Sequence, residues 1–290
     1  MHYLHLPGMS RARQAARVAR ACMPVVRELS RGRPTVLDAH YLYPDGVAAL
    51  HIARALQLPC VVTARGSDVN VLAEIPVIRE QVRSTMHDAA RLFAVSSALS
   101  GRFADVLGNG SRVETVRNGV DLELYRPGDR AAARRALGLP GDRQVVLGVG
   151  RLVEGKGFHH AAAALAGLGG DAVLALVGDG PERERIAGLL APQRLCLLGA
   201  RPRDQVILAY QASDLLVLPT YREGWPNVVT EALACGLSVV ASAVGGIPEI
   251  LADDRVGALV PPGDTEALQV ALQRFLAAPP DPRLARALAE

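Results

Sequence analysis

The sequence lacks most of the features that mark secreted, membrane-spanning or metal-binding proteins. It has only four cysteines in 290 residues, with no C-x-x-C pair and no metal-ligand spacing, so neither a disulfide scaffold nor a zinc site is expected. No apolar run reaches the ~18 residues that a membrane-spanning helix needs, and the start lacks the basic lead and long apolar core of a signal peptide. The net charge of +3 is too small to indicate a nucleic-acid binder. We therefore expect a cytoplasmic protein with free thiols.

What the sequence does contain is a regular alternation of short apolar runs with helical segments. This alternation predicts an α/β fold, in which parallel sheets are covered by helices on both faces. The length favours two domains, and a Pro- and Gly-rich connector at 122–141 suggests a boundary between domains 1–125 and 126–290. The predicted strands are 36–39, 60–63, 92–95, 113–116, 145–149, 173–177, 195–199, 215–218 and 238–242, and a last strand and turn are predicted over 257–264.

The stretch 215–242 organises the second domain. An apolar strand ends at Pro219, and an irregular loop leads into a helix over 228–235, which places Glu223 at the carboxyl end of a strand and Glu231 in the first turns of the helix. Ligands of open parallel sheets bind at this edge, where helix N-termini offer free backbone donors. Two carboxylates here can accept hydrogen bonds from sugar hydroxyls. Taken alone, they also fit plainer roles, as a solvated loop acid and a carboxylate that complements the helix dipole by about 0.3–1 kcal/mol.

Three segments around these glutamates carry a family resemblance: Glu-Gly-Trp-Pro-Asn at 223–227, Glu-Ala-Leu-Ala-Cys-Gly at 231–236 and Val-Gly-Gly-Ile-Pro-Glu at 244–249. Together they resemble the donor site of family 4 glycosyltransferases, and the glutamate pair matches the E-x7-E motif. The resemblance implies the GT-B fold, with two Rossmann-like domains facing across a cleft. It also implies transfer of a sugar from a nucleotide-diphosphate sugar with retention of configuration. Glu231 would then accept from the ribose. The groups that would grip the sugar and β-phosphate are Glu223 and the backbone of Gly224, Trp225, Pro226, Asn227 and Val228.

A Gly-rich turn at 150–157 follows the first strand of the second domain. Its glycines let the backbone approach a ligand, and Arg151 and Lys156 supply positive charge for a diphosphate, although two exposed basic residues are the plainer alternative. The turn partly mimics a dinucleotide-binding fingerprint, but the third small residue is absent and Asp171 precedes the next strand instead of ending it. The resemblance instead gives Arg151 and Lys156 the diphosphate. It adds three residues of later turns to the donor site, namely Gly178, Gly180 and Arg201.

Turns in the first domain hold a second set of polar residues, which the carboxyl-end rule directs towards a common cleft: His40, Arg65, Asp68 and Asn118. The segments 39–46 and 63–68 resemble family 4 enzymes that build bacterial surface polysaccharides, including teichuronic acid glycosyltransferases. Many members have a histidine where Arg65 stands. An arginine cannot act as a base but can hold a phosphate or carboxylate. We predict catalytic roles for Glu223, Arg65 and Asp68 and acceptor-side roles for His40 and Asn118, against the plainer alternatives of a hydrogen-bonded histidine and an Arg65–Asp68 surface ion pair worth under about 1 kcal/mol.

The resemblance also implies that the first domain is incomplete. A whole enzyme of this family opens with a strand and a Gly-Gly loop that precede anything in this sequence, and it ends with helices that cross back to the first domain. We therefore expect a fragment or a wrongly chosen start codon, and a non-catalytic nucleotide-sugar binder is the alternative function. No lysine of the second half is placed to hold pyridoxal phosphate in a recognisable pattern, and no apolar-flanked D-x-D motif is present. We expect neither cofactor nor metal, with the nucleotide-diphosphate sugar as substrate.

A basic segment near the start predicts a contact with membranes. Residues 10–29 have helical apolar spacing, with Ser10 as a candidate cap, and they contain five arginines: Arg11, Arg13, Arg17, Arg20 and Arg27. A basic amphipathic helix can lie on anionic lipid, so we expect peripheral contact with the inner face of the membrane. A simple solvated face is the alternative. The expected acceptor is a polysaccharide or a lipid-linked sugar, and no nucleic acid is expected.

Overall fold

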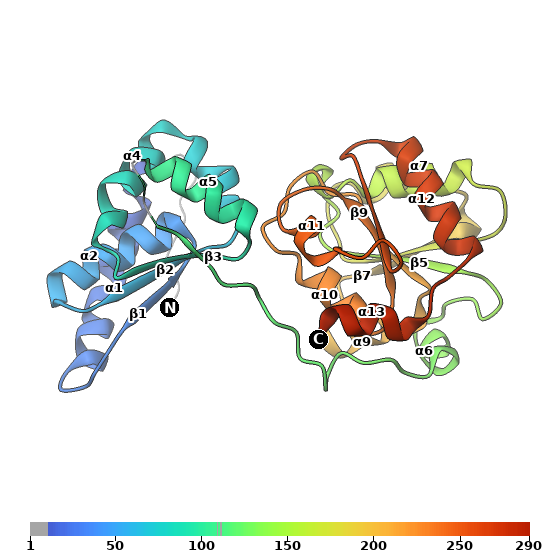
Figure 1. Ribbon diagram of the computed structural model, residues 1–290, viewed down its shortest axis with the longest axis horizontal. Coiled ribbons are helices and arrows are strands. Elements are labelled where there is room, and N and C mark those ends of the chain that lie inside the picture. Colours follow the sequence, from blue (N-terminus) through green and yellow to red (C-terminus); the bar gives the residue numbers. More distant parts are fainter. Residues whose placement is uncertain (1–10, 109, 111) are drawn as a thin grey trace. The chain divides into compact units, whose positions relative to one another are not determined.

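The computed structural model describes residues 11–108, 110 and 112–290, and the chain divides into two compact units between Asn118 and Gly119 (Figure 1). This division lies earlier than the boundary after residue 125 that the sequence suggested. The connector joins the second unit because Tyr125, only 4% exposed, packs in that unit's core. In the described part of the chain, no helix is long and apolar enough to cross a bilayer.

Unit 1, the part up to Asn118, has a four-stranded parallel sheet in the order β1-β2-β3-β4. The predicted strands are present with small shifts, although the last spans two residues instead of four. The first helix begins at Gln14 after a 3-10 turn, Arg11–Arg13, and the candidate cap Ser10 lies outside the described residues. The elements are α1 (Gln14–Ser30), β1 (Leu37–His40), α2 (Val47–Leu56), β2 (Cys60–Ala64), α3 (Ser67–Asn70), α4 (Pro76–Thr85), β3 (Arg91–Ala94), α5 (Ser97–Leu107) and β4 (Glu114–Thr115).

Unit 2, from Gly119 onwards, has a six-stranded parallel sheet in the order β10-β9-β8-β5-β6-β7. The first five strands have the predicted bounds, and the sixth lies within the predicted strand and turn over 257–264. They are β5 (Val145–Val149), β6 (Val173–Val177), β7 (Leu195–Gly199), β8 (Leu215–Leu218), β9 (Ser238–Ser242) and β10 (Gly257–Val260). The helices are α6 (Arg130–Leu137), α7 (Phe158–Gly167), α8 (Arg183–Ala187), α9 (Arg203–Ala212), α10 (Asn227–Ala234), α11 (Ile247–Ile250), α12 (Thr265–Ala277) and α13 (Pro282–Ala289).

The central strands of the unit 2 sheet are buried on both faces, whereas the edge strands β7 and β10 are partly exposed. The core residues of unit 2 form two clusters, one beneath α7 and α12 and the other beneath α6, α9 and α10 (Figure 1). Strands such as β6 and β8 are apolar at every position because both faces need a hydrophobic side chain. Each fully buried Val or Leu contributes about 1.5–3 kcal/mol. The sheet is therefore a firm platform for the loops at its edges.

The strand order of unit 2 reverses between β5 and β8. After β5 the chain adds β6 and β7 on one side, and it then returns to add β8, β9 and β10 on the other. The loops that follow β5 and β8 consequently leave the sheet as neighbours at its carboxyl edge. In doubly wound sheets this switch point is where ligands bind.

Candidate functional site

The two loops at the switch point are joined by an ion pair. Lys156 ends a 3-10 turn after β5, Glu154–Lys156, and Glu223 lies in the loop after β8. The Lys156 ammonium Nζ lies 2.5 Å from Glu223 Oε1, and the two side chains are 31% and 12% exposed. The cation predicted to hold a phosphate and the carboxylate predicted to grip a sugar are thus in direct contact.

Backbone contacts fix the approach of these two loops. Tyr221 N–H and the Thr220 hydroxyl both donate to the Gly155 carbonyl oxygen, at 3.0 and 3.1 Å. Gly157 has a φ of +65°, and a Cβ atom there would lie 2.0 Å from the Pro219 carbonyl oxygen. Only glycine permits this close approach, so the Lys156 turn depends on Gly157.

A third loop, after β9, packs against the backbone of Glu223. Gly246 N–H donates to the Gly224 carbonyl oxygen at 2.9 Å. Gly245 has a φ of +56°, and a Cβ atom on it would lie 2.0 Å from the Glu223 carbonyl oxygen. The 244–249 segment therefore packs against the backbone of the Glu223 loop and helps to fix its conformation.

Glu231, in the second turn of α10, is held by a tyrosine that the sequence did not suggest. The hydroxyl of Tyr210, on α9, donates to Glu231 Oε2 at 2.8 Å, and the tyrosine is fully buried. Burial, reinforced by the Glu231 charge, raises the pKa of Tyr210 well above its ordinary value, so its hydroxyl remains a donor. The two residues are 21 positions apart, and no local pattern signals their contact.

The start of α10 contributes backbone donors. Pro226 occupies the N-cap position without a side-chain hydrogen bond, and Asn227 and Val228 are the first residues of the helix. The N–H groups of a first helical turn point away from the helix, towards any ligand at its N-terminus. Gly224 and Pro226 are buried, and Trp225 is half-buried against the core. This arrangement suits an anion at the helix N-terminus.

The remaining predicted donor residues lie on neighbouring turns. Leu152 N–H donates to the Asp179 carbonyl oxygen at 2.9 Å, which sets the 178–180 turn, with Gly178 and Gly180, beside the turn after β5. Arg151 is exposed. Arg201 is also exposed, but its guanidinium donates to Leu198 O at 2.7 Å and to Gln205 Oε1 at 2.9 Å, so its side chain is engaged locally.

In unit 1, Asp68 differs from the surface ion pair considered from the sequence. It is fully buried, and its carboxylate accepts backbone N–H bonds from Gly66 at 2.7 Å, Leu42 at 2.9 Å and Arg65 at 3.1 Å. These bonds pin the turn after β1 to the turn after β2. Both carboxylate oxygens of Asp68 thus accept hydrogen bonds from the backbone, and the predicted catalytic role of Asp68 stays a prediction.

The other polar residues of unit 1 fall into two places. The Arg65 guanidinium Nη1 donates to Asn118 Oδ1 at 3.2 Å, which joins the turn after β2 to the chain after β4. His40, whose side chain is 52% exposed, lies at the end of β1 with Nε2 3.5 Å from Asp38 Oδ2. Arg65 and Asn118 are thus hydrogen-bonded to each other, while His40 lies close to Asp38 on its own strand.

Comparisons with known proteins identify the family and the fold. The model of the family "Glycosyl transferases group 1" matches residues 129–290, and that of "Glycosyltransferase Family 4" matches residues 1–124. The chain belongs to the family 4 glycosyltransferases. Its two parallel-sheet units have the GT-B fold, and a sucrose-phosphate synthase from Thermosynechococcus elongatus superimposes with a TM-score of 0.79 at 26% identity, over 99% of this chain and 74% of that one.

Two relatives are longer than the part that this chain matches. TuaC of Bacillus subtilis (strain 168), named as a glycosyltransferase of teichuronic acid biosynthesis, is 31% identical over 277 residues, which cover 94% of this chain and 69% of TuaC. A D-inositol 3-phosphate glycosyltransferase of Mycobacteroides abscessus is 39% identical over 164 residues, 54% of this chain and 37% of that enzyme. The matched part therefore spans about two thirds of the first relative and less than half of the second.

A histidine pair next to the Glu223 loop was also not predicted from the sequence. The ring of His160, on α7, lies between the Tyr221 hydroxyl at 2.7 Å and the Thr265 hydroxyl at 2.6 Å. Tyr221 belongs to the Glu223 loop and Thr265 begins α12. The neighbouring His159 is buried, with its ring centroid 4.2 Å from that of His160. His160 thus ties the Glu223 loop to the helices behind it.

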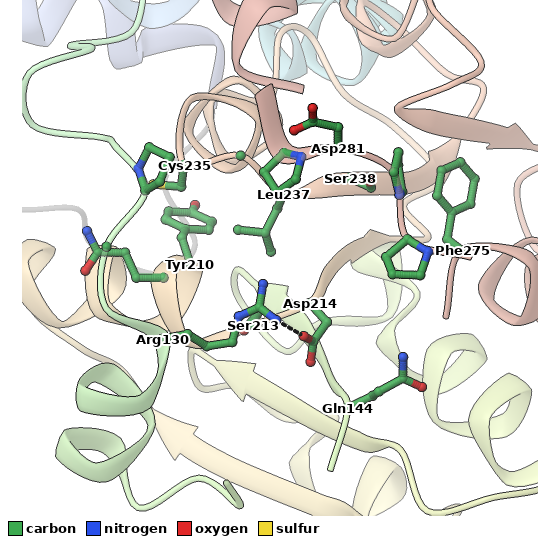
Figure 2. A pocket seen from close by; sticks show the side chains of 17 residues that line it. Arg130, Gln144, Tyr210, Ser213, Asp214, Cys235, Leu237, Ser238, Phe275 and Asp281 are labelled. Atoms are coloured by element: carbon green, nitrogen blue, oxygen red, sulfur yellow. Dashed lines mark hydrogen bonds and ion pairs between the residues drawn. The ribbon is translucent and has the colours of Figure 1, made fainter. Parts of the chain in front are cut away.

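A cavity of about 640 Å³ lies at the opposite edge of the sheet (Figure 2). Its walls include Gln144, Asp214 and Ser238, which stand at the amino ends of β5, β8 and β9. Tyr210 and Phe275 line other parts of it. Because ligands of such sheets bind at the carboxyl ends, we do not assign the donor site to this cavity.

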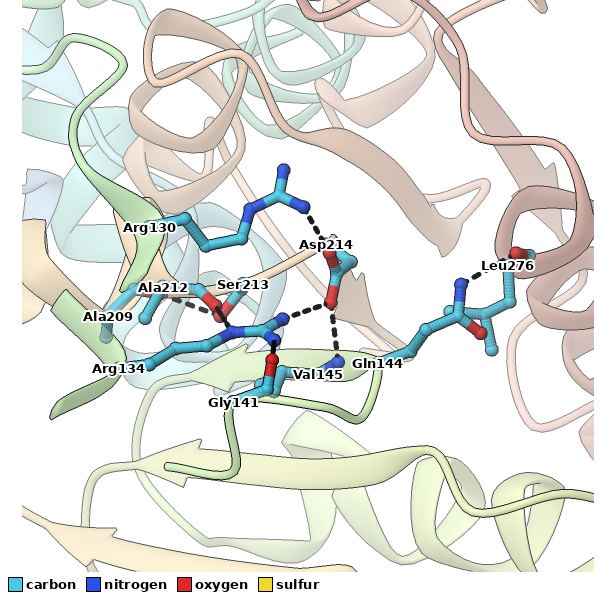
Figure 3. A network of polar contacts seen from close by, with 10 residues as sticks. All are labelled: Arg130, Arg134, Gly141, Gln144, Val145, Ala209, Ala212, Ser213, Asp214 and Leu276. Atoms are coloured by element: carbon cyan, nitrogen blue, oxygen red, sulfur yellow. Dashed lines mark hydrogen bonds and ion pairs between the residues drawn. The ribbon is translucent and has the colours of Figure 1, made fainter. Parts of the chain in front are cut away.

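A charged network beside the cavity holds the sheet to α6 (Figure 3). The Asp214 carboxylate accepts from Arg134 Nη2 at 2.6 Å, from Arg130 Nη1 at 2.7 Å and from Val145 N–H at 2.7 Å. Arg134 is buried and also donates to two carbonyl oxygens, those of Ala212 and Gly141. Each guanidinium nitrogen of Arg134 and each carboxylate oxygen of Asp214 thus has a hydrogen-bond partner, as a structural ion pair requires.

Proposed function

We propose that the chain binds a nucleotide-diphosphate sugar at the carboxyl edge of the unit 2 sheet and transfers the sugar to a cell-surface polysaccharide or lipid-linked acceptor. The observation that carries this proposal is the Lys156–Glu223 pair at the switch point. A phosphate needs a fixed cation, and a sugar needs acceptors for its hydroxyls. The pair offers both at one place, on loops that the backbone contacts of Gly157 and Gly245 hold together.

The chemical demand of the reaction is to stabilise negative charge on the departing diphosphate. Lys156, the exposed Arg151 and the partial positive charge at the N-terminus of α10 would stabilise the diphosphate without a metal. Glu223 and the backbone of 224–228 would hold the sugar, and Glu231 the ribose. We expect the loss of Lys156 to cost on the order of 1.5–3 kcal/mol of binding, as for a hydrogen bond to a charged group.

On the acceptor side we propose Arg65 and Asn118 as a polar pair and His40 as a further contact. Arg65 is held by Asn118 Oδ1 at 3.2 Å. It cannot serve as a base, because a guanidinium stays charged, but its planar donors fit a phosphate or a carboxylate of the acceptor. The teichuronic acid assignment of TuaC motivates an anionic acceptor of this kind.

We further propose that α1 binds to the surface of an anionic membrane. The chain would then meet its acceptor at the inner face of that membrane. The surface of α1 carries the exposed Arg20 and Arg27 together with the exposed apolar side chains of Val25 and Leu29. Arginines attract anionic headgroups and the apolar side chains enter the interface. Co-sedimentation with phosphatidylglycerol vesicles should be strong for the wild type and weak for Arg20→Glu/Arg27→Glu. Equal sedimentation of both would contradict the proposal.

The alternative function is binding of a nucleotide sugar without transfer. The two functions differ in turnover, so the test is to incubate the chain with UDP-glucose or GDP-mannose and lipid extracts that supply acceptors, and to measure released nucleotide and labelled product. Transfer that is lost in Glu223→Gln, persists with EDTA and gives a product of unchanged anomeric configuration by NMR would support the enzyme. Binding without any release would support the alternative.

A further inference from the structure

Tyr210 stands out because its hydroxyl is not needed for the core in which it lies. The side chain is fully buried among apolar residues between α9 and the sheet. A phenylalanine would fill almost the same space without burying a polar group, which costs free energy unless it is hydrogen-bonded. Packing alone therefore does not explain why this residue is a tyrosine. Its hydroxyl donates a hydrogen bond to Glu231 Oε2 at 2.8 Å.

The carboxylate is not there to satisfy the phenol. Placing a charged glutamate in a half-buried position costs more free energy than burying a tyrosine hydroxyl. The need to give the Tyr210 hydroxyl a partner therefore does not explain the presence of Glu231. The bond from Tyr210 uses one of about four acceptor positions on the carboxylate. Glu231 keeps the capacity to accept from two neighbouring hydroxyls, as the vicinal diol of a ribose presents them.

Further contacts hold Tyr210 in place beside Glu231. The ring of Tyr125 packs edge-on against that of Tyr210, with the centroids 6.2 Å apart. The Tyr125 hydroxyl accepts from Arg203 Nε at 3.2 Å, and the guanidinium of Arg203 lies 5.7 Å from the ring centroid. Two buried rings therefore restrict where the Tyr210 hydroxyl lies, and through it the orientation of Glu231.

We propose that Tyr210 is a positioning residue for ribose recognition, whose buried hydroxyl orients Glu231 so that the carboxylate accepts from both ribose hydroxyls of the nucleotide. The inference rests on the proposed function, because it assumes that a nucleotide binds beside Glu231. A glutamate side chain in water samples many rotamers, and a carboxylate that is oriented in advance loses less freedom when the ligand arrives. The hydroxyl of Tyr210 thus contributes to selection of ribose over deoxyribose.

The test compares UDP and GDP with their 2′,3′-dideoxy forms by calorimetric titration of the wild type and Tyr210→Phe. The wild type should prefer the ribonucleotide. In Tyr210→Phe this preference should fall about tenfold, the size expected for a hydrogen bond to a charged group, while affinity for the dideoxy nucleotide stays unchanged and shows that the variant is folded. In a Glu231→Ala background, Tyr210→Phe should have no effect on nucleotide affinity.

Tyr43→Phe, which removes the hydroxyl of a buried tyrosine in unit 1, is the matched control and should leave the preference intact. An unchanged preference in Tyr210→Phe would overturn the inference. Equal losses for the ribo- and dideoxynucleotides would also overturn it, since they would show a merely structural role. A folded wild-type chain that binds neither UDP nor GDP would overturn the proposed function itself, and this inference with it.

Discussion

Replacing Glu223 by glutamine should change the affinities for a nucleoside diphosphate and for its sugar conjugate in opposite directions. The Glu223 carboxylate lies against the Lys156 ammonium, so a diphosphate that binds Lys156 brings its own negative charge beside this carboxylate. Two unit charges about 5 Å apart interact by about 3 kcal/mol at an effective dielectric constant of about 20. Because Lys156 is 31% exposed, solvent screening should reduce the gain from neutralising Glu223 to about 1 kcal/mol.

Titration calorimetry measures both sides of this prediction. Glu223→Gln should bind UDP or GDP about fivefold more tightly than the wild type. It should bind the corresponding nucleotide sugar more weakly, because charge-assisted bonds to the sugar hydroxyls, about 1.5–3 kcal/mol, are lost. Glu266→Gln, at an exposed position on α12, changes net charge equally and should alter neither affinity. If Glu223→Gln weakens both ligands by the same factor, Glu223 only orients Lys156 and the assignment of a sugar contact is wrong.

Three further predictions concern the framework of the site. Gly245→Ala should lower nucleotide-sugar affinity in calorimetry at least about tenfold, because its Cβ would lie 2.0 Å from the Glu223 carbonyl oxygen. The control is Gly138→Ala, at a similar φ of +66° but with open space around it. It should lose only about 1–2 kcal/mol of stability through backbone strain and bind as the wild type does. Asp214→Ala should lower the free energy of unfolding by about 3–5 kcal/mol in urea titrations, since it leaves buried Arg134 unpaired; a loss under about 1 kcal/mol would contradict the network's role. Burial, and then the charges of His160 and Arg185, lower the pKa of His159, so the unfolded chain binds a proton more readily and stability should fall as pH drops below about 6.5. His159→Gln should melt with a smaller pH dependence between about pH 7.5 and 5.5, and an unchanged dependence would refute this.

The central strands of the unit 2 sheet were predictable from the sequence because they are buried on both faces. They are mostly apolar runs, such as 173–177, that end at a glycine, a proline or a polar turn. The carboxyl-edge rule then placed Lys156 and Glu223 on the correct edge. Their direct contact was not predicted, because it depends on strand order, and only the pairing of β5 with β8 makes the two loops neighbours.

Contacts between distant segments account for what the sequence analysis missed. Asp68 looked like a partner for the Arg65 side chain three positions away, yet it binds the Leu42 backbone, 26 positions away, and is buried by that turn. The bond from Tyr210 to Glu231 and the His160–Tyr221 bridge likewise join residues 21 and 61 positions apart. Local periodicity reports which side chains are buried but not which buried polar groups meet.

The most direct test of the account is whether the donor site binds a nucleotide through Lys156. Titration of the chain with UDP and with GDP should show micromolar binding of one of them. Lys156→Ala should weaken this binding about tenfold or more, while Arg135→Ala, which removes an exposed charge on α6, should leave it unchanged. A folded chain that binds neither nucleotide, or a Lys156→Ala variant that binds as tightly as the wild type, would contradict the central claim.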